Sequence, residues 1–156
     1  MAGPHKSGRI KTKAGIAAKR FAIVVAEWNE EITESLYESA VNTLLSHGVP
    51  RKNIIRKNVP GSFELSLGGL LMARKKNIHA VICLGCVIQG ETPHFDYICQ
   101  AVAYGITQAN LLTGKPVVFG VLTTLNKQQA EDRAGGRHGN KGEEAALTAL
   151  QMVEME

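Results

Sequence analysis

The sequence has 156 residues, of which 44% are hydrophobic and 21% charged, with 18 Lys and Arg against 14 Asp and Glu. A chain of this length can bury the core of one domain. It contains no apolar run approaching the ~18 residues of a membrane span and no apolar segment of a signal peptide, so we expect a cytoplasmic protein without a membrane partner. A transit peptide is a weaker alternative, because the basic first twenty residues contain few Ser or Thr.

The positive charge is concentrated at the N-terminus. Six basic residues from Lys6 to Arg20 precede the first acidic residue, and removing them from the eighteen leaves twelve basic against fourteen acidic side chains. A basic arm can bind nucleic acid. No aromatic residue is interleaved with these charges, which favours a solvated tail and predicts no nucleic-acid partner. We therefore predict a flexible arm over residues 1–18 and one domain over 19–156.

Four short apolar runs, each followed by a helical pattern, set the order of the predicted elements. Strands are predicted over residues 21–26, 54–59, 80–84 and 116–122, with the more polar 54–59 nearer a sheet edge. Helices are predicted from Glu30 to a stop at Gly48 and Pro50, and then over residues 63–76, 93–113, 127–134 and 143–153. Gly85 is expected to end the third strand, and Gly68-Gly69 indicates close packing of the second helix.

This strict alternation predicts an α/β fold, a three-layer α/β/α sandwich with a four-stranded parallel sheet and right-handed crossovers. Ligands of such sheets bind beyond the carboxyl ends of the strands. Those ends are followed by residues 28–29, 61–64, 87–94 and 123–124. We expect these four loops to meet at one rim.

The third loop combines an anion-binding pattern with a histidine. Thr92 is predicted to cap a helix whose first residue is Pro93 and whose second is His94. The free N–H groups and positive dipole end of such a helix favour an anion. The dipole opposes protonation of His94 whereas a bound phosphate favours it. Arg133 and Lys141 are the candidate counter-charges, although Arg133 alone also fits a solvated helix residue.

Other rim residues have both a binding and a structural interpretation. Trp28 fits a platform that stacks on a flat heterocycle, or a large residue that caps the core. Phe63 and Glu64 fit a ring contact beside a carboxylate, while Glu64 equally fits a first-turn charge that complements the helix dipole. Asn29 is a plausible N-cap of the first helix.

Three cysteines, Cys83, Cys86 and Cys99, include one C-x-x-C spacing. In an extended strand the Cα atoms of Cys83 and Cys86 lie ~10 Å apart, beyond the ~7 Å limit for a disulfide. The sequence contains no second C-x-x-C or H-x-x-x-H that would complete a zinc site. We therefore expect buried, reduced thiols and no metal.

Four ordered blocks resemble one enzyme family, the 6,7-dimethyl-8-ribityllumazine synthases. The blocks read V-P-G-S-F-E-L (59–65), G-C-V-I-Q-G-E-T-P-H-F-D-Y (85–97), F-G-V-L-T-T (119–124) and D-R-A-G-G-R-H-G-N-K-G (132–142). The likeness runs from about Phe21 to the C-terminus. It implies a flavodoxin-like sandwich and a transferase of riboflavin biosynthesis. Such enzymes condense 5-amino-6-ribitylamino-uracil with 3,4-dihydroxy-2-butanone 4-phosphate, without a cofactor, and release phosphate and water.

The resemblance also implies roles for individual residues. His94 matches the proton-transfer residue, and Trp28 stands where the family usually has a Phe that stacks on the pyrimidine. Phe119, Arg133 and Lys141 are implied to reach the site from the adjacent subunit. Substrate contacts are implied for Trp28, Asn29, Ser62, Phe63, Glu64, Val87, Ile88, Glu91, Thr92, Phe119, Arg133 and Lys141.

Two residues depart from the family pattern. Gln89 stands where a basic residue is common, and Glu91 stands where a small residue is common. Backbone N–H donation survives both changes, but an added carboxylate near a phosphate can weaken its binding.

The resemblance implies a homo-oligomer, either a pentamer or a capsid of twelve pentamers, with riboflavin synthase as a candidate partner. An N-terminal strand over residues 14–20 would join the sheet of a neighbouring subunit. The sequence leaves two alternatives open. One is a non-catalytic flavin- or lumazine-binding protein with Trp28 as its platform, and the other is a shell-forming or anion-binding scaffold in which the basic arm is the working part.

Overall fold

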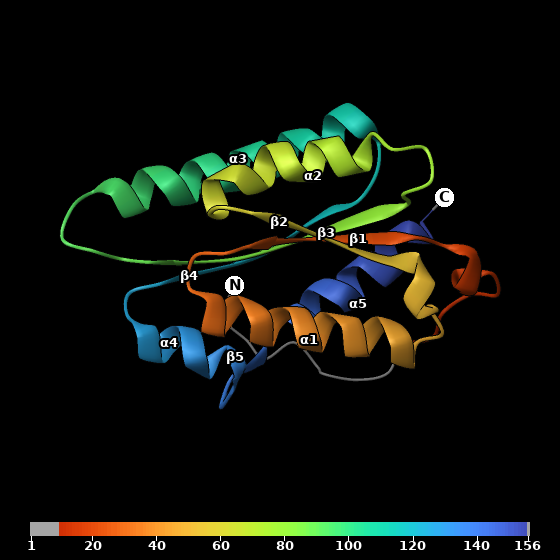
Figure 1. Ribbon diagram of the computed structural model, residues 1–156, viewed down its shortest axis with the longest axis horizontal. Helices are drawn as coiled ribbons and strands as arrows, with labels where there is room; N and C mark the ends of the chain where they lie inside the picture. The colour runs from red at the N-terminus through yellow and green to blue at the C-terminus, as the bar shows by residue number, and fades with distance from the viewer. Residues whose placement is uncertain (1–9, 156) are drawn as a thin grey trace.

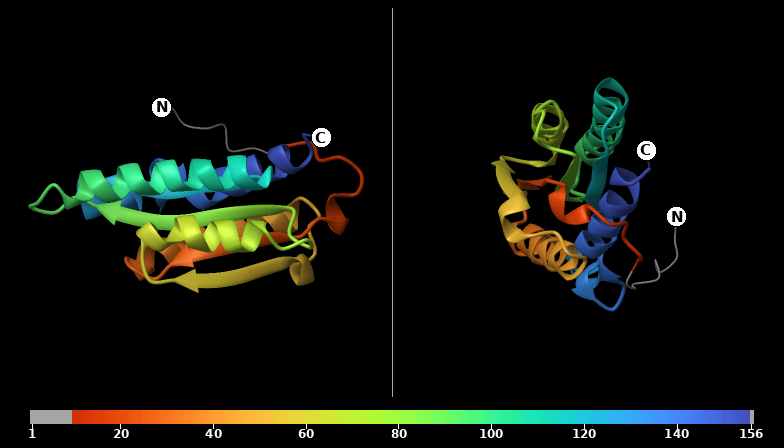
Figure 2. Two further views of the ribbon diagram at one scale, coloured as in Figure 1. Left: turned by 90° about the horizontal axis from the view of Figure 1, so that it is seen from above. Right: turned by 90° about the vertical axis from the view of Figure 1, so that its right-hand side faces the viewer.

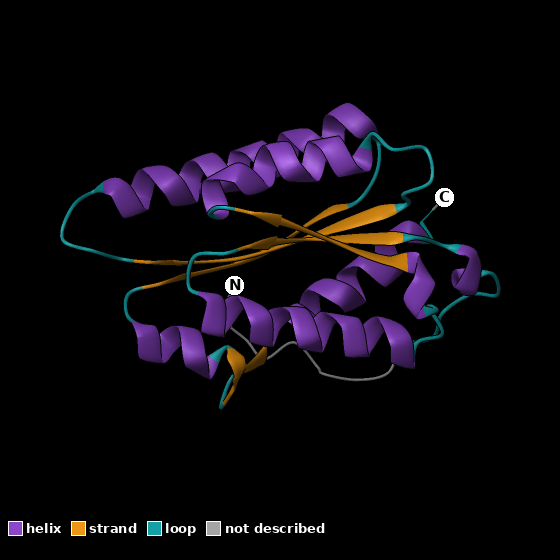
Figure 3. Ribbon diagram, in the orientation of Figure 1, coloured by secondary structure: helices purple, strands orange, loops and turns teal. Residues whose placement is uncertain are grey.

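A parallel four-stranded sheet separates two layers of helices in the computed structural model, which describes residues 10–155. The strands are β1 (Phe21–Ala26), β2 (Ile54–Val59), β3 (Ala80–Ile88) and β4 (Val117–Thr124), in the order β2-β1-β3-β4. Helices α2 (Leu65–Ala73) and α3 (His94–Thr113) cover one face, and α1 (Glu30–Ser46), α4 (Lys127–Asp132) and α5 (Lys141–Val153) cover the other (Figures 1 and 3). The predicted three-layer sandwich is confirmed.

The core consists of two apolar clusters, one on each face of the sheet. Alternate residues of a strand point to opposite faces, so Phe21, Ile23 and Val25 pack with α1 and α5, whereas Ala22 and Val24 pack with α2 and α3. Every residue of β1 is buried, as predicted for a central strand, while β2 is half-buried at the sheet edge. Figure 2 shows both helical layers end-on.

Strand β3 is longer than the sequence predicted. It continues through Gly85 to Ile88 and pairs with β4 along its whole length beyond Ala80. A Cβ on Gly85 would lie 2.4 Å from Ser62 Oγ and 2.9 Å from Leu65 Cδ1. The glycine therefore allows a close approach of the loop after β2, and the prediction that it ends the strand is wrong.

The glycine pair of α2 packs closely, as predicted. A Cβ on Gly68 would lie 3.0 Å from Val59 Cγ1, and one on Gly69 would lie 3.0 Å from both Cys83 Sγ and Val117 Cγ1. The helix can therefore lie flat on the sheet at this point.

Several predicted boundaries change. The predicted 63–76 helix splits into a 3-10 turn (Ser62–Glu64) and α2. Pro93 is the N-cap of α3 and makes no side-chain cap, so His94 is the first helical residue and the predicted capping by Thr92 is wrong. The glycine-rich turn after α4 forms a hairpin of β5 (Ala134–Gly136) and β6 (Gly139–Asn140).

The described part of the predicted arm contacts the domain. Ile10 N–H donates to His47 Nε2 at 3.2 Å, and Lys13 N–H donates to Glu154 Oε1 at 2.6 Å. Ile16 is buried in the core at the start of a 3-10 turn (Ile16–Ala18), so the stretch expected to form a strand for a neighbour is not extended here. Residues 1–9 lie outside the described part of the chain.

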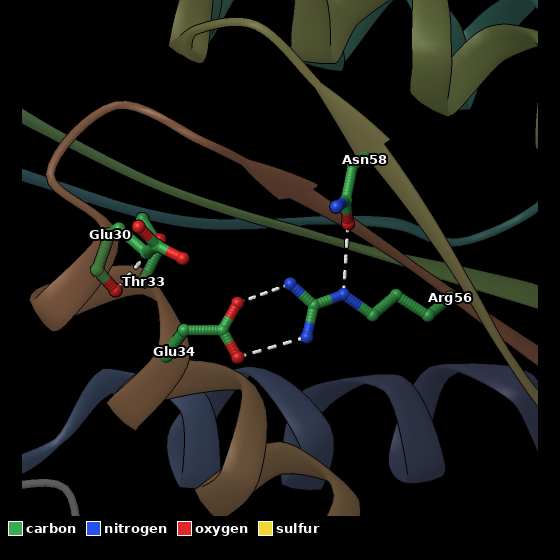
Figure 4. A network of polar contacts seen from close by, with 5 residues as sticks. All are labelled: Glu30, Thr33, Glu34, Arg56 and Asn58. Atoms are coloured by element: carbon green, nitrogen blue, oxygen red, sulfur yellow. Dashed lines mark hydrogen bonds and ion pairs between the residues drawn. The ribbon is translucent and has the colours of Figure 1, made fainter.

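An ion pair joins the edge strand β2 to α1. Arg56 binds both carboxylate oxygens of Glu34, with one Nη1–Oε2 distance of 3.0 Å, and its Nε donates to Asn58 Oδ1 at 2.9 Å (Figure 4). The guanidinium carbon lies 4.3 Å from the centre of the Tyr37 ring. The hydrogen bonds from Arg56 lower the pKa of Glu34 below its ordinary value of 4.5, against the opposing effect of partial burial.

Replacing Arg56 with Gln should therefore destabilise the chain in a pH-dependent manner. Because the folded-state pKa of Glu34 is depressed, the contribution is present above the unfolded-state pKa and is lost as the pH falls through the folded-state value. We expect a loss of about 0.5–1 kcal/mol at pH 7, since both side chains are partly exposed. Urea unfolding of both proteins at pH 7 and below pH 4 measures the difference in their free energies of unfolding. A difference that stays constant with pH would contradict this prediction.

Candidate functional site

The loops after the four strands are joined into one rim at the carboxyl end of the sheet. Glu27 N–H donates to Val59 O at 2.9 Å and Trp28 N–H to Pro60 O at 3.2 Å, which joins the loops after β1 and β2. Gln89 N–H donates to Thr124 O at 2.9 Å, which joins the loops after β3 and β4. The rim predicted from the sequence is therefore present in the fold.

Two aromatic side chains of this rim face solvent. Trp28 is 75% exposed and Phe63 is 55% exposed. The indole lies beside the loop after β2, where a Cβ on Gly61 would be 3.8 Å from Trp28 Cδ1. Trp28 therefore does not cap the core of this chain, and its ring is available as a flat apolar surface for a ligand.

Glu64 and Ser62 lie in the same loop in different environments. The carboxylate of Glu64 accepts a hydrogen bond from Gly61 N–H at 3.0 Å, so it closes its own turn. Ser62 is only 7% exposed, and its hydroxyl has no hydrogen-bond partner among residues 10–155. A buried hydroxyl without a partner costs about 1–3 kcal/mol, and such groups occur where a ligand or water completes the hydrogen bond.

Asn29 occupies the predicted N-cap position of α1, but its side chain binds another strand instead of capping the helix. No side-chain cap is formed, and the amide Nδ2 donates to Cys86 O of β3 at 2.9 Å. Its backbone is left-handed, with φ 60° and ψ 50°. The sequence interpretation found the position and missed the partner, because the contact crosses from the first loop to the third strand.

The start of α3 projects beyond the sheet and past α2 (Figures 1 and 2). The six residues from Gln89 to His94 are all exposed, and the buried residues of α3 begin only at Val102. The predicted anion-binding turn, with Glu91 and Thr92, therefore stands at a helix N-terminus that residues 10–155 leave uncovered.

The other three predicted site residues lie apart from this turn. Phe119 is five residues before the end of β4 at Thr124, or about 17 Å along the strand. Arg133 and Lys141 are neighbours across the β5–β6 hairpin, with Lys141 N–H donating to Arg133 O at 2.8 Å. They belong to the layer of α4 and α5, on the opposite face of the sheet from α3. One chain does not bring them to His94.

All three cysteines are free thiols, and two of them are buried as predicted. Cys83 and Cys86 are buried along β3, and Cys99 lies half-buried on α3. Burial raises the pKa of Cys83 to about 12 and that of Cys86 to about 11, so both are protonated at neutral pH. Within residues 10–155 no group of three or more His, Cys, Asp or Glu could hold a metal ion, and no helix is long and apolar enough to cross a membrane.

Comparison with known proteins identifies the family to which this fold belongs. A model of the 6,7-dimethyl-8-ribityllumazine synthase family matches residues 18–156. The chain belongs to this family. The family match covers every strand and helix from β1 to α5, including the whole rim. The resemblance that the four sequence blocks indicated is confirmed.

Individual members of this lumazine synthase family are similar in sequence to this chain over most of their length. A 6,7-dimethyl-8-ribityllumazine synthase of Cytophaga hutchinsonii is 69% identical over 138 residues, which cover 88% of this chain and 87% of the relative. Those of Parabacteroides distasonis and Porphyromonas gingivalis are 60% and 57% identical, covering 84% and 88% of this chain and 82% and 85% of their own lengths.

Proposed function

We infer that this chain is a 6,7-dimethyl-8-ribityllumazine synthase of riboflavin biosynthesis. It condenses 5-amino-6-ribitylamino-uracil with 3,4-dihydroxy-2-butanone 4-phosphate to give 6,7-dimethyl-8-ribityllumazine, phosphate and water. The family match over residues 18–156 carries this proposal. The exposed Trp28 ring and the unpartnered Ser62 hydroxyl at one rim support it.

The pyrimidine substrate is assigned to the rim of β1, β2 and β3. The indole of Trp28 stacks on the ring, with Phe63 beside it. Hydroxyl groups of the ribityl chain meet the polar groups of the loops after β1 and β2. The ring edge meets the backbone of the last residues of β3. The contacting residues are Trp28, Asn29, Ser62, Phe63, Glu64, Val87 and Ile88.

The phosphate substrate is assigned to the start of α3. Backbone N–H groups around Glu91 and Thr92 and the positive end of the helix dipole attract the phosphate. Arg133 offers a planar pair of donors to its oxygens, with Lys141 as a second cation. His94, the first residue of the helix, is within the same exposed turn and serves as the proton carrier.

The reaction is a series of condensations and eliminations. The amine attacks the ketone, water leaves through an imine, phosphate is eliminated, and a second carbonyl condensation closes the ring. None of these steps transfers a hydride or an electron. Holding the two substrates together supplies much of the rate, and a positioned proton carrier such as His94 adds roughly 10²–10⁴-fold.

The complete site is assigned to the junction of two chains. Phe119 lies about 17 Å from the rim of its own chain, and the start of α3 is uncovered. Exposed apolar residues continue along α2 and α3 at helical spacings, namely Leu67 and Leu71, and Tyr97, Tyr104 and Leu111. A neighbouring copy covers them, and Phe119, Arg133 and Lys141 reach the site from that copy. We propose a homo-oligomer, a pentamer or twelve pentamers, in the cytoplasm, with riboflavin synthase as a candidate partner.

Two substitutions separate the proposed roles. His94→Ala should lower kcat about 100-fold, the lower end of the range for a proton carrier. Arg133→Ala should mainly raise KM for the phosphate substrate, about 10- to 100-fold, because a charged hydrogen bond contributes about 1.5–3 kcal/mol. Steady-state kinetics with each substrate varied measures both.

Arg74→Ala is the matched control, since Arg74 is exposed at the C-terminus of α2, away from the rim. Unchanged kinetics for the phosphate substrate in Arg133→Ala would refute the assignment of Arg133. Absence of lumazine formation by the unmodified protein would refute the proposed function as a whole.

A second candidate function is binding of riboflavin or lumazine without turnover. The observation that favours it is the large, exposed indole of Trp28 at a position where the family usually has Phe. Titration with riboflavin beside an assay of lumazine formation separates the two, because tight binding without product supports only this candidate.

A further inference from the structure

Strand β3 extends beyond the strand that pairs with it on one side. Its pairing with β1 ends at Val25↔Leu84, whereas its pairing with β4 continues to Ile88↔Thr124. Alternate residues of a strand turn their N–H and C=O groups to the same neighbour. The peptide groups of Cys86 and Ile88 therefore face the side on which β1 has already ended.

Asn29 donates a hydrogen bond to the backbone carbonyl of β3 that β1 leaves unpaired. Its amide Nδ2 lies 2.9 Å from Cys86 O, so this buried acceptor keeps a partner, as buried backbone groups require. The loop that carries Asn29 also holds Trp28, whose N–H donates to Pro60 O at 3.2 Å. The backbone of this loop is thus held at Trp28 by the loop after β2 and at Asn29 by the end of β3.

This arrangement has two local costs. Asn29 is the only residue other than glycine with a positive φ within residues 10–155, and a left-handed backbone costs a non-glycine residue of order 1–3 kcal/mol, less for Asn. Its side chain also forgoes the N-cap of α1, which typically contributes about 1 kcal/mol. Both losses occur at one residue of the rim, the residue whose amide binds Cys86 O.

We propose that Asn29 is a positioning residue, and this proposal rests on the proposed function of the rim. It replaces the missing continuation of β1 and holds the ring of Trp28 in a fixed place relative to the end of β3. With the Cys86 carbonyl occupied, the peptide groups of Ile88 are left for the edge of the heterocycle that stacks on Trp28. The Trp28 ring and the peptide groups of Ile88 then form one rigid unit.

Two variants of the full chain test this role. Asn29→Gly keeps the left-handed backbone and removes the amide, while Asn29→Asp keeps the shape and replaces the donor with an acceptor. Trp28 is the only tryptophan of the chain, so its fluorescence anisotropy and its quenching by acrylamide report on this loop alone. Asn77→Gly, at an exposed position before β3, is the matched control.

In the protein without substrate we expect lower anisotropy and stronger quenching of Trp28 in both variants. KM for the ribitylamino-pyrimidine should rise about tenfold, the loss of roughly one hydrogen bond. KM for the phosphate substrate and kcat should stay close to those of the unmodified enzyme. The control should change none of these quantities.

Three outcomes would overturn the inference. A raised KM with unchanged Trp28 fluorescence would mean that Asn29 only contacts the substrate. Equal increases in both KM values together with a lower Tm would mean a general structural role, and no change at all would mean no role. If the unmodified protein forms no lumazine, the proposed function fails, but the fluorescence comparison still decides whether Asn29 positions Trp28.

Discussion

Mixed oligomers of His94→Ala and Arg133→Ala chains should regain activity that each variant lacks at low concentrations of the phosphate substrate. In the proposed arrangement, a site takes His94 from one chain and Arg133 from the next, as in a head-to-tail ring. At equal mixing about a quarter of the junctions in such a ring combine an intact His94 with an intact Arg133. Unfolding both variants together, refolding them and assaying lumazine formation measures the recovery.

Two comparisons make this result interpretable. The same variants refolded separately and then mixed should keep the low activity of the single variants, because each oligomer then contains only one kind of chain. Activity of the co-refolded sample equal to the mean of the two variants would place both residues of a site in one chain. That outcome would contradict the shared site and leave the family assignment intact.

Gly142→Ala should cause a large loss of stability. In most helices this change is favourable by about 0.5–1 kcal/mol. Here the new Cβ would lie 1.9 Å from Leu36 O and 2.7 Å from Leu36 C, both backbone atoms of α1. The first turn of α5 would have to move away from α1, and overpacking of this kind costs 1–3 kcal/mol or more.

A loss of about 3 kcal/mol corresponds to a decrease in Tm of roughly 10 °C for a domain of this size. Thermal unfolding followed by circular dichroism measures it. Gly90→Ala is the control for stability, because a Cβ at this position would meet no atom within 4 Å beyond its chain neighbours. Equal Tm values for Gly142→Ala and the unmodified protein would show that α5 can shift without cost.

The sequence predicted the sheet well because its signal is local. An apolar run such as residues 21–26 indicates a strand covered on both faces, and the more polar residues 54–59 indicate an edge. Both predictions are confirmed. The rim followed from the order of strands and helices alone, since the loops after parallel strands lie at the same end of a sheet.

What the sequence did not predict depends on contacts between distant segments. Gly85 was interpreted as a strand end, but it provides room for Ser62. Asn29 was interpreted as a cap, but it binds a carbonyl of another strand. Asparagine three residues after the end of a buried strand is a usable signal, because it is one of the few residues besides glycine that tolerate a left-handed backbone. The role of Phe119, and the placement of Phe119 and Arg133 on a neighbouring subunit, came only from family resemblance.

The placement of the thiols bears on what holds the core together. Cys83 and Cys86 follow each other along β3, both buried, and Cys99 lies on a separate helix. The extended backbone keeps the first two too far apart to be linked. The packing of the core therefore rests on apolar contacts of these thiols and not on a covalent link between Cys83 and Cys86.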